Sequence, residues 1–64
     1  MTIDREYIDT NVKRYEKLLE DANERAIAAI GRADYWTAMV AINEAAGHKA
    51  CIEELEFQLD VIGV

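Results

Sequence analysis

Two stretches of the chain repeat hydrophobic residues at alternating steps of four and three, the spacing of one side of an α-helix. The first series is Ile8, Val12, Tyr15, Leu19, Ala22, Ala26 and Ala29. The second series is Ala38, Ala41, Ala45, His48, Ile52, Leu55, Leu59 and Ile62. The pattern predicts two long helices, one over about residues 3–30 and one over about residues 35–62.

The residues between the two series predict a short turn at 31–34. Gly31 suits the left-handed conformation that commonly follows the end of a helix, and Asp34 can cap the second helix. Thr2 or Asp4 can cap the first helix in the same way. A short turn makes consecutive helices antiparallel neighbours, so we predict an all-α fold with residues 1–64 forming one helical hairpin.

The hairpin register places residues level when their numbers sum to about 63 to 65, which puts Tyr15 near His48. Gly47 is then a glycine in the middle of a helix, where it costs about 0.5–1 kcal/mol relative to alanine. That cost indicates a close approach at Gly47. The group that approaches is Tyr15, a second subunit or a ligand, in that order of preference.

The first half of the second helix is apolar on most sides, and one partner helix cannot cover all of this apolar surface. A 64-residue chain is marginal alone, and its single cysteine cannot form a disulfide within the chain. We therefore expect a homo-oligomer, such as a dimer that forms a four-helix bundle, with a different protein as the alternative partner. The candidate interface residues are Trp36, Met39, Val40, Ile42, Ala46 and Gly47.

Charge limits the partners, because seven Lys and Arg against 13 Asp and Glu give a net charge of −6. This balance disfavours binding to nucleic acid or to an anionic membrane surface. After Lys49 the chain has four acidic residues and no basic one, which forms a solvated face or attracts a basic partner. With no leader-like start and no apolar run near the roughly 20 residues that span a bilayer, we expect a cytoplasmic protein.

Glu44, His48 and Cys51 follow one another at helical spacing, and all three residue types can bind zinc. Structural zinc usually takes four cysteine or histidine ligands, whereas this chain has one of each, so a full set requires a second subunit. We expect no metal and no cofactor, with His48 packed in the helix interface and Cys51 buried as a small hydrophobe. A nucleophilic Cys51 assisted by His48 needs a cleft and oxyanion donors, for which a narrow hairpin has little room.

Two pairs of carboxylates, Asp21 with Glu24 and Glu53 with Glu56, have the three-residue spacing by which helices present ligands to magnesium. This pattern resembles the helical nucleotide pyrophosphatases. The hairpin register opposes the resemblance, because Glu53 lies about 15 Å of helix rise from the level of Asp21. We expect no enzyme activity.

Two further resemblances bear on fold and function. The segment "DYWTA", Asp34–Ala38, looks like the turn of a tetratricopeptide repeat, in which an aromatic residue and an alanine pack the second helix against the first. The segment "GHKACIEELEFQL", Gly47–Leu59, is similar to small helical accessory proteins encoded by bacteriophages. The second resemblance implies a viral protein that acts in the host cytoplasm by binding a host or viral protein.

The expected function is therefore that of a non-enzymatic, acidic, homo-oligomeric binding protein. One alternative is a structural subunit of a larger assembly. The other is an oligomer that sequesters a small anionic, nucleotide-like ligand between subunits, since aromatic faces stack on bases and cations pair with phosphate. The candidate residues for such a ligand are Arg32, Tyr35, Trp36, Asn43 and Lys49.

Overall fold

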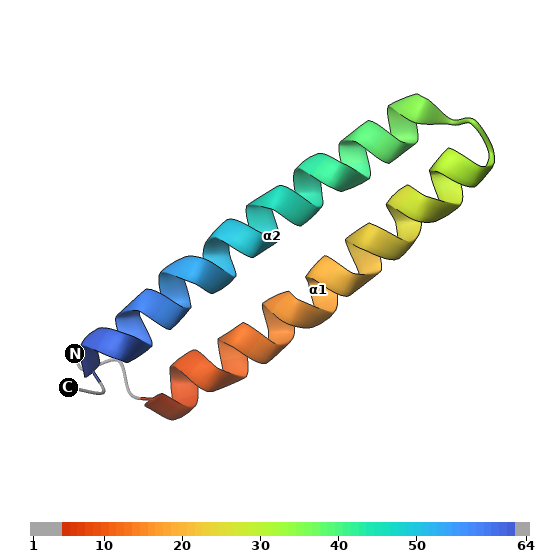
Figure 1. Ribbon diagram of the computed structural model, residues 1–64. Coiled ribbons are helices and arrows are strands. Elements are labelled where there is room, and N and C mark those ends of the chain that lie inside the picture. The colour runs from red at the N-terminus through yellow and green to blue at the C-terminus, as the bar shows by residue number, and fades with distance from the viewer. Residues whose placement is uncertain (1–4, 63–64) are drawn as a thin grey trace.

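The computed structural model describes residues 5–62, and in this range the chain forms an antiparallel pair of helices (Figure 1). Helix α1 runs Arg5–Gly31 and helix α2 runs Tyr35–Ile62. The hairpin is elongated, 47 Å by 18 Å by 14 Å. The prediction of an all-α fold with two long packed helices is confirmed, while the two residues proposed to cap the first helix lie outside the described range.

The core of the hairpin is the line along which the two helices meet, called the seam below. Its fully buried members in the described range all belong to the two predicted series. They are Ile8, Ala22, Ala26, Ala29, Ala38, Ala41, Ala45 and Ile52. Six of these eight are alanines, whose small side chains let the helices approach closely near the turn. Because burial stabilises by about 0.8 kcal/mol per CH₂ group, so small a core gives the single hairpin limited stability.

Larger side chains occupy the seam farther from the turn, where they are half-buried. Tyr15 and His48 meet there, with ring centroids 6.0 Å apart and ring planes at 40°. This separation lies within the range of aromatic contacts. The predicted position of His48 in the helix interface is confirmed, and so is its proximity to Tyr15.

Backbone hydrogen bonds close the end of α1 in the pattern of a Schellman motif. The N–H of Asp34 donates to the carbonyl of Ala29 at 2.9 Å, and the N–H of Ala33 donates to the carbonyl of Ile30 at 2.9 Å. The left-handed residue of this motif is Ala33, with φ of 59°. The prediction that Gly31 takes the left-handed position is wrong, because α1 continues through Gly31 and the motif falls two residues later.

Exchanging these two residue types should stabilise the hairpin. Ala33→Gly removes the steric cost of a Cβ atom in the left-handed region, which is about 1 kcal/mol. Gly31→Ala adds a helix-favouring methyl group that meets no atom within 4 Å, for a gain of about 0.5–1 kcal/mol. Urea unfolding of the double variant should therefore show an increase of about 1–2 kcal/mol. A decrease would show that the turn has a different backbone conformation.

Asp34 caps the start of α2, as predicted. Its Oδ1 atom accepts a hydrogen bond from the backbone N–H of Thr37 at 3.2 Å, and its carbonyl accepts the first helical bond, from the N–H of Ala38 at 3.1 Å. The side chain of Thr37 first, and then its backbone N–H, lowers the pKa of Asp34 below the usual value. The charged carboxylate is therefore the form that the folded state favours.

This pKa shift predicts a pH dependence of stability. A carboxyl group whose pKa is lowered by folding stabilises fully above its unfolded pKa, about 3.9, and loses that contribution as the pH falls through the folded value. Asp34→Asn should keep the cap, because asparagine caps as well as aspartate, and should flatten the loss of stability below about pH 4. Thermal unfolding from pH 2 to pH 6 measures both effects. An unchanged acid profile in the variant would show that the cap does not drive it.

Candidate functional site

The two flanks of the hairpin differ in character, and the contacts between the helices show which residues share each flank. On one flank Arg25 of α1 pairs with Glu44 of α2, and Arg25 also lines a small cavity with Val40. This flank is called the polar flank below. Residues seven positions apart lie in one line along a helix, called a column, and share a flank, so the second flank consists of the columns on the side away from Arg25. Near the turn these columns hold Ile27, Ile30, Tyr35, Met39, Ile42 and Ala46, called the turn patch below.

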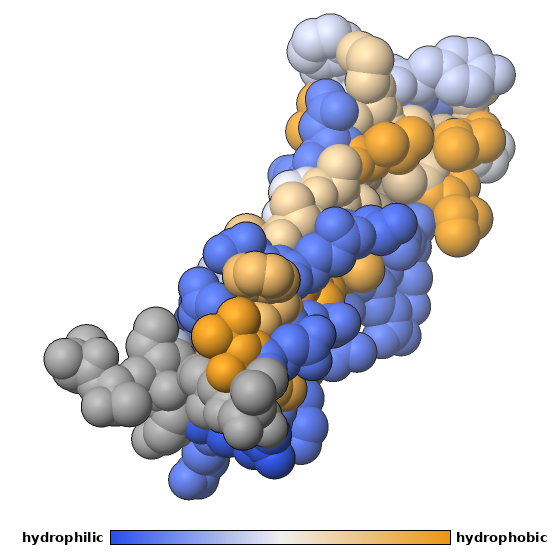
Figure 2. Space-filling view, turned by 60° about the vertical axis from the view of Figure 1, so that its left-hand side comes forward, coloured by the Kyte–Doolittle hydropathy of each residue, from blue (hydrophilic) through white to orange (hydrophobic). Residues whose placement is uncertain are grey.

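The turn patch is uncharged and open to solvent. Ile27 and Tyr35 are 70% and 69% exposed, and Ile30, Met39 and Ile42 are each about half exposed. Figure 2 shows hydrophobic residues most concentrated toward the end that carries the turn. Neither α1 nor α2 combines the length and apolar character that crossing a membrane requires. Contiguous exposed apolar surface of this kind is a feature that many interaction surfaces share.

The predicted interface residues divide between the two flanks. Met39, Ile42 and Ala46 belong to the turn patch, and Trp36, which is 71% exposed, lies beside it on the outer side of α2. Val40 and Gly47 are seven residues apart in one column of the polar flank. The two groups therefore cannot contribute to one flat interface.

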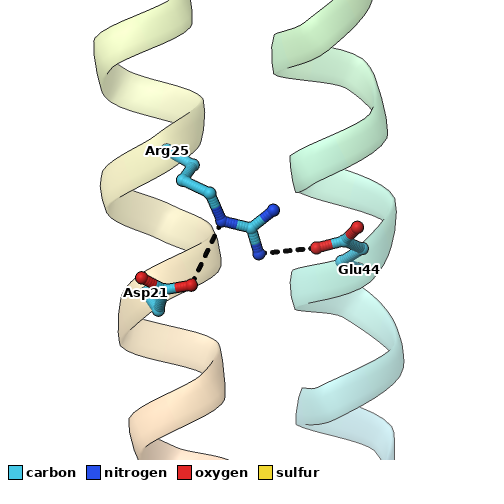
Figure 3. A network of polar contacts seen from close by, with 3 residues as sticks. All are labelled: Asp21, Arg25 and Glu44. Atoms are coloured by element: carbon cyan, nitrogen blue, oxygen red, sulfur yellow. Dashed lines mark hydrogen bonds and ion pairs between the residues drawn. The ribbon is translucent and has the colours of Figure 1, made fainter.

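The polar flank, which holds Arg25, carries a network of ion pairs near the turn (Figure 3). The guanidinium of Arg25 donates through Nε to Asp21 at 3.1 Å, and through an Nη atom to Glu44 at 2.6 Å. The hydrogen bond that Arg25 donates to the Glu44 carboxylate is the main cause that raises the pKa of Arg25. Because all three side chains are partly exposed, the two ion pairs contribute little to stability.

A groove lies on this same flank toward the end opposite the turn. It has a volume of about 410 Å³. Its lining residues are Tyr7, Asn11, Tyr15, Ala50, Cys51, Glu54 and Leu55. The amide of Asn11 donates to the backbone carbonyl of Tyr7 at 2.8 Å, so part of the polar lining is engaged within α1. The groove is mainly apolar and has one carboxylate among its described lining residues.

The three residues with zinc-binding side chains have separate environments in the hairpin. Glu44 pairs with Arg25, His48 packs against Tyr15, and Cys51 is exposed. Within residues 5–62, no three His, Cys, Asp or Glu side chains gather closely enough to hold a metal ion. The prediction that Cys51 is buried is wrong, because its column runs along the exposed groove rather than the seam.

The candidate residues for a small anionic ligand do not converge within one chain. Arg32 lines the small cavity of about 210 Å³ beside Arg25, on the polar flank. Tyr35 belongs to the turn patch on the other flank, and Trp36 and Asn43 lie on the outer side of α2. Lys49 lies two turns beyond Ile42 in the column of the turn patch. These groups meet only if two copies bring them together.

Gly47 has open space around it. A methyl group placed there would meet no atom within 4 Å, and the residue is exposed. The predicted close approach of Tyr15 to Gly47 is therefore wrong, because Tyr15 packs on the seam side of α2 against His48. Of the three candidates for the group that approaches Gly47, a second subunit and a ligand remain.

Gly47→Ala is expected to stabilise the hairpin by about 0.5–1 kcal/mol, because alanine lowers the conformational cost of the helix and meets nothing in the chain. Thermal unfolding at several protein concentrations measures the change. We expect the gain at every concentration, because Gly47 lies away from the turn patch. A loss of stability that grows with protein concentration would place Gly47 in an interface between subunits.

Two features of the site go beyond the predicted interface residues and the predicted register. Ile27 and Ile30 complete the turn patch from α1; both are apolar residues beside the seam that one hairpin leaves uncovered, but they were not among the predicted interface residues. Their columns lie on the flank away from Arg25. The pairing of Arg25 with Glu44 was also missed. Their residue numbers sum to 69, above the 63 to 65 expected of level residues, and the long arginine side chain spans the difference.

Fold and surface together define a class: an all-α helical hairpin with an exposed apolar patch beside its turn. No protein-family model, no curated protein and no solved structure matches the chain.

Proposed function

We propose that the protein is a non-enzymatic binding protein that self-associates through the turn patch. The observation that carries the proposal is the exposure of five large apolar side chains on one flank, with exposed fractions from 49% to 70%. The columns of this flank carry no charge from Asn23 to Ile30 on α1 or from Tyr35 to Ala46 on α2, and Glu20 lies at the border of the patch. A second apolar surface can therefore cover the patch beside the turn without burying a charge. Homo-oligomers with closed symmetry are the commonest assemblies of such surfaces.

The composition of the core also supports self-association. The buried part of the seam is mainly alanine, and Ile8 and Ile52 are its large members among the described residues. Small domains with so little apolar burial usually need a disulfide, a metal or a partner subunit. The chain has one cysteine, which is exposed, so a partner subunit is the aid that the sequence allows.

The setting we propose follows from the acidic charge and the resemblance to bacteriophage accessory proteins. A net charge of −6 disfavours nucleic acid as the partner and favours a protein surface, which is basic where it meets the acidic half of α2. Such a protein acts in the cytoplasm by occupying a host or viral protein. The self-associated form then presents its binding surfaces in more than one copy.

Native mass spectrometry of two samples of the tagged protein tests the proposal. One sample is purified from the expression host, and the other is recovered after mixing with cell extract. We expect the purified chain at a multiple of 7.3 kDa, with a bound protein appearing in the extract sample. A small added mass of a few hundred daltons instead would favour the ligand-sequestering alternative. The chain at 7.3 kDa in both samples would contradict the proposed function.

A further inference from the structure

We propose that the occupant of the turn patch is a second copy of this chain held in one orientation. The two hairpins overlap only through their turn halves, and their open ends, at Arg5 and Ile62, point in opposite directions. The orientation rests on the proposed self-association and goes beyond it, because the apolar patch by itself permits several arrangements.

Each column of the flank changes from apolar to charged along its length. In α2, the column of Tyr35 and Ile42 continues as Lys49 and Glu56, and the column of Met39 and Ala46 continues as Glu53 and Asp60. In α1, the column of Ile30 continues as Asn23, Glu16 and Asp9, and the column of Ile27 continues as Glu20, Lys13 and Glu6. The same flank is therefore uncharged next to the turn, as far as Asn23 on α1 and Ala46 on α2, and carries seven carboxylates and two lysines beyond these residues.

This gradient discriminates among three ways to pair the flanks. A parallel pair brings the two acidic halves together, so like charges face each other across the interface. A full-length antiparallel pair lays each turn patch on the charged half of the other copy and buries unpaired charge against apolar side chains. Overlap of the turn halves alone places apolar residues against apolar residues and leaves every carboxylate of the open halves in water.

A second copy fits the patch better than an unrelated partner does. A two-fold pair requires a self-complementary surface, and the patch combines isoleucine and methionine side chains with Tyr35, which can interdigitate across an axis. Specific interfaces bury about 800 Å² on each partner. The six side chains of the patch, together with the neighbouring Trp36, supply the apolar centre that such an interface needs. The alanine-rich seam gives the chain a reason to require this cover in every molecule.

The exposed Cys51 allows the orientation to be measured on the native sequence, because it is the chain's single cysteine. A nitroxide label on Cys51 reports the distance between the two copies by pulsed electron paramagnetic resonance. If the two-fold axis passes near Met39, Cys51 lies about 18 Å along the helix from it, which predicts a separation of about 36 Å or more. Cys51 lies on the flank away from the patch, so the second label is placed in the same column. Cys51→Ser with Gln58→Cys moves it about 10.5 Å farther along the helix, which lengthens the separation by up to about 21 Å.

Each outcome of this experiment decides the orientation. A parallel pair keeps the two labels level at either position, so their distance is set by the width of the pair and does not grow from position 51 to position 58. A full-length antiparallel pair places the axis near the level of Cys51, so the first distance is set by that width alone and is shorter than in the proposed overlap. Either result, or a mass of three copies or more, overturns the orientation while the proposed self-association stands. A chain that stays monomeric, whether or not it captures a different protein, overturns both.

Discussion

Replacing Ile42 with glutamate is expected to dissociate the assembly. Ile42 is 52% exposed in the hairpin and lies within the turn patch, so the proposed pairing would cover its side chain with apolar neighbours. A carboxylate there is buried without a partner, which costs several kcal/mol, and each 1.4 kcal/mol is a factor of ten in affinity. We expect the dissociation constant to rise at least about 100-fold, measured by sedimentation velocity over a concentration series.

Val40→Glu is the matched control for this variant. Val40 is 42% exposed, also aliphatic and β-branched, and lies two residues away on the same helix. It lines the small cavity with Arg25 and Arg32, so a carboxylate there faces cations and water. We expect its self-association to equal that of the unchanged chain. Dissociation by Val40→Glu with no effect of Ile42→Glu would place the interface on the polar flank.

Ala22→Leu is expected to give the largest loss of stability among single changes in the seam. Ala22 is 0% exposed, and it lies where the two helices approach through alanine side chains. The added atoms must push the helices apart or take a strained rotamer, and such overpacking typically costs about 1–3 kcal/mol. The midpoint of thermal unfolding should fall by about 4–8 °C for each kcal/mol in a chain of this size. Circular dichroism at a fixed protein concentration measures the shift.

Ala28→Leu controls for the change in side-chain size and helix propensity. Ala28 is on the same helix but is exposed, so the added atoms enter solvent. Surface changes of this kind usually shift stability by less than about 0.5 kcal/mol. Equal losses in the two variants would contradict a close-packed alanine seam.

The fold was predictable because one physical pattern dominates the chain. Apolar residues at alternating steps of four and three can share a side only in a helix, and a short turn leaves two such helices no arrangement except an antiparallel pair. The buried residues from Ile8 to Ile52 therefore fall in the two predicted series. The contact of Tyr15 with His48 followed from the register, and the cap at Asp34 from its place before the second series.

The parts that sequence did not predict depend on small rotations of the helices and on backbone choice. The left-handed residue of the turn is Ala33 rather than Gly31. The two choices differ in free energy by only about 1 kcal/mol, so the position of glycine alone did not locate it. Cys51 and Gly47 lie close to the seam in sequence spacing, yet each is turned far enough from it to face solvent. The role of the turn patch depends on a partner, which one chain does not contain.

Sedimentation equilibrium of the purified chain measures the proposed self-association, in which a second subunit covers the turn patch. At micromolar concentrations we predict a mass of twice 7.3 kDa, falling toward a single chain on dilution and on introducing Ile42→Glu. A mass of 7.3 kDa throughout that range, with fully formed helices by circular dichroism, would contradict it.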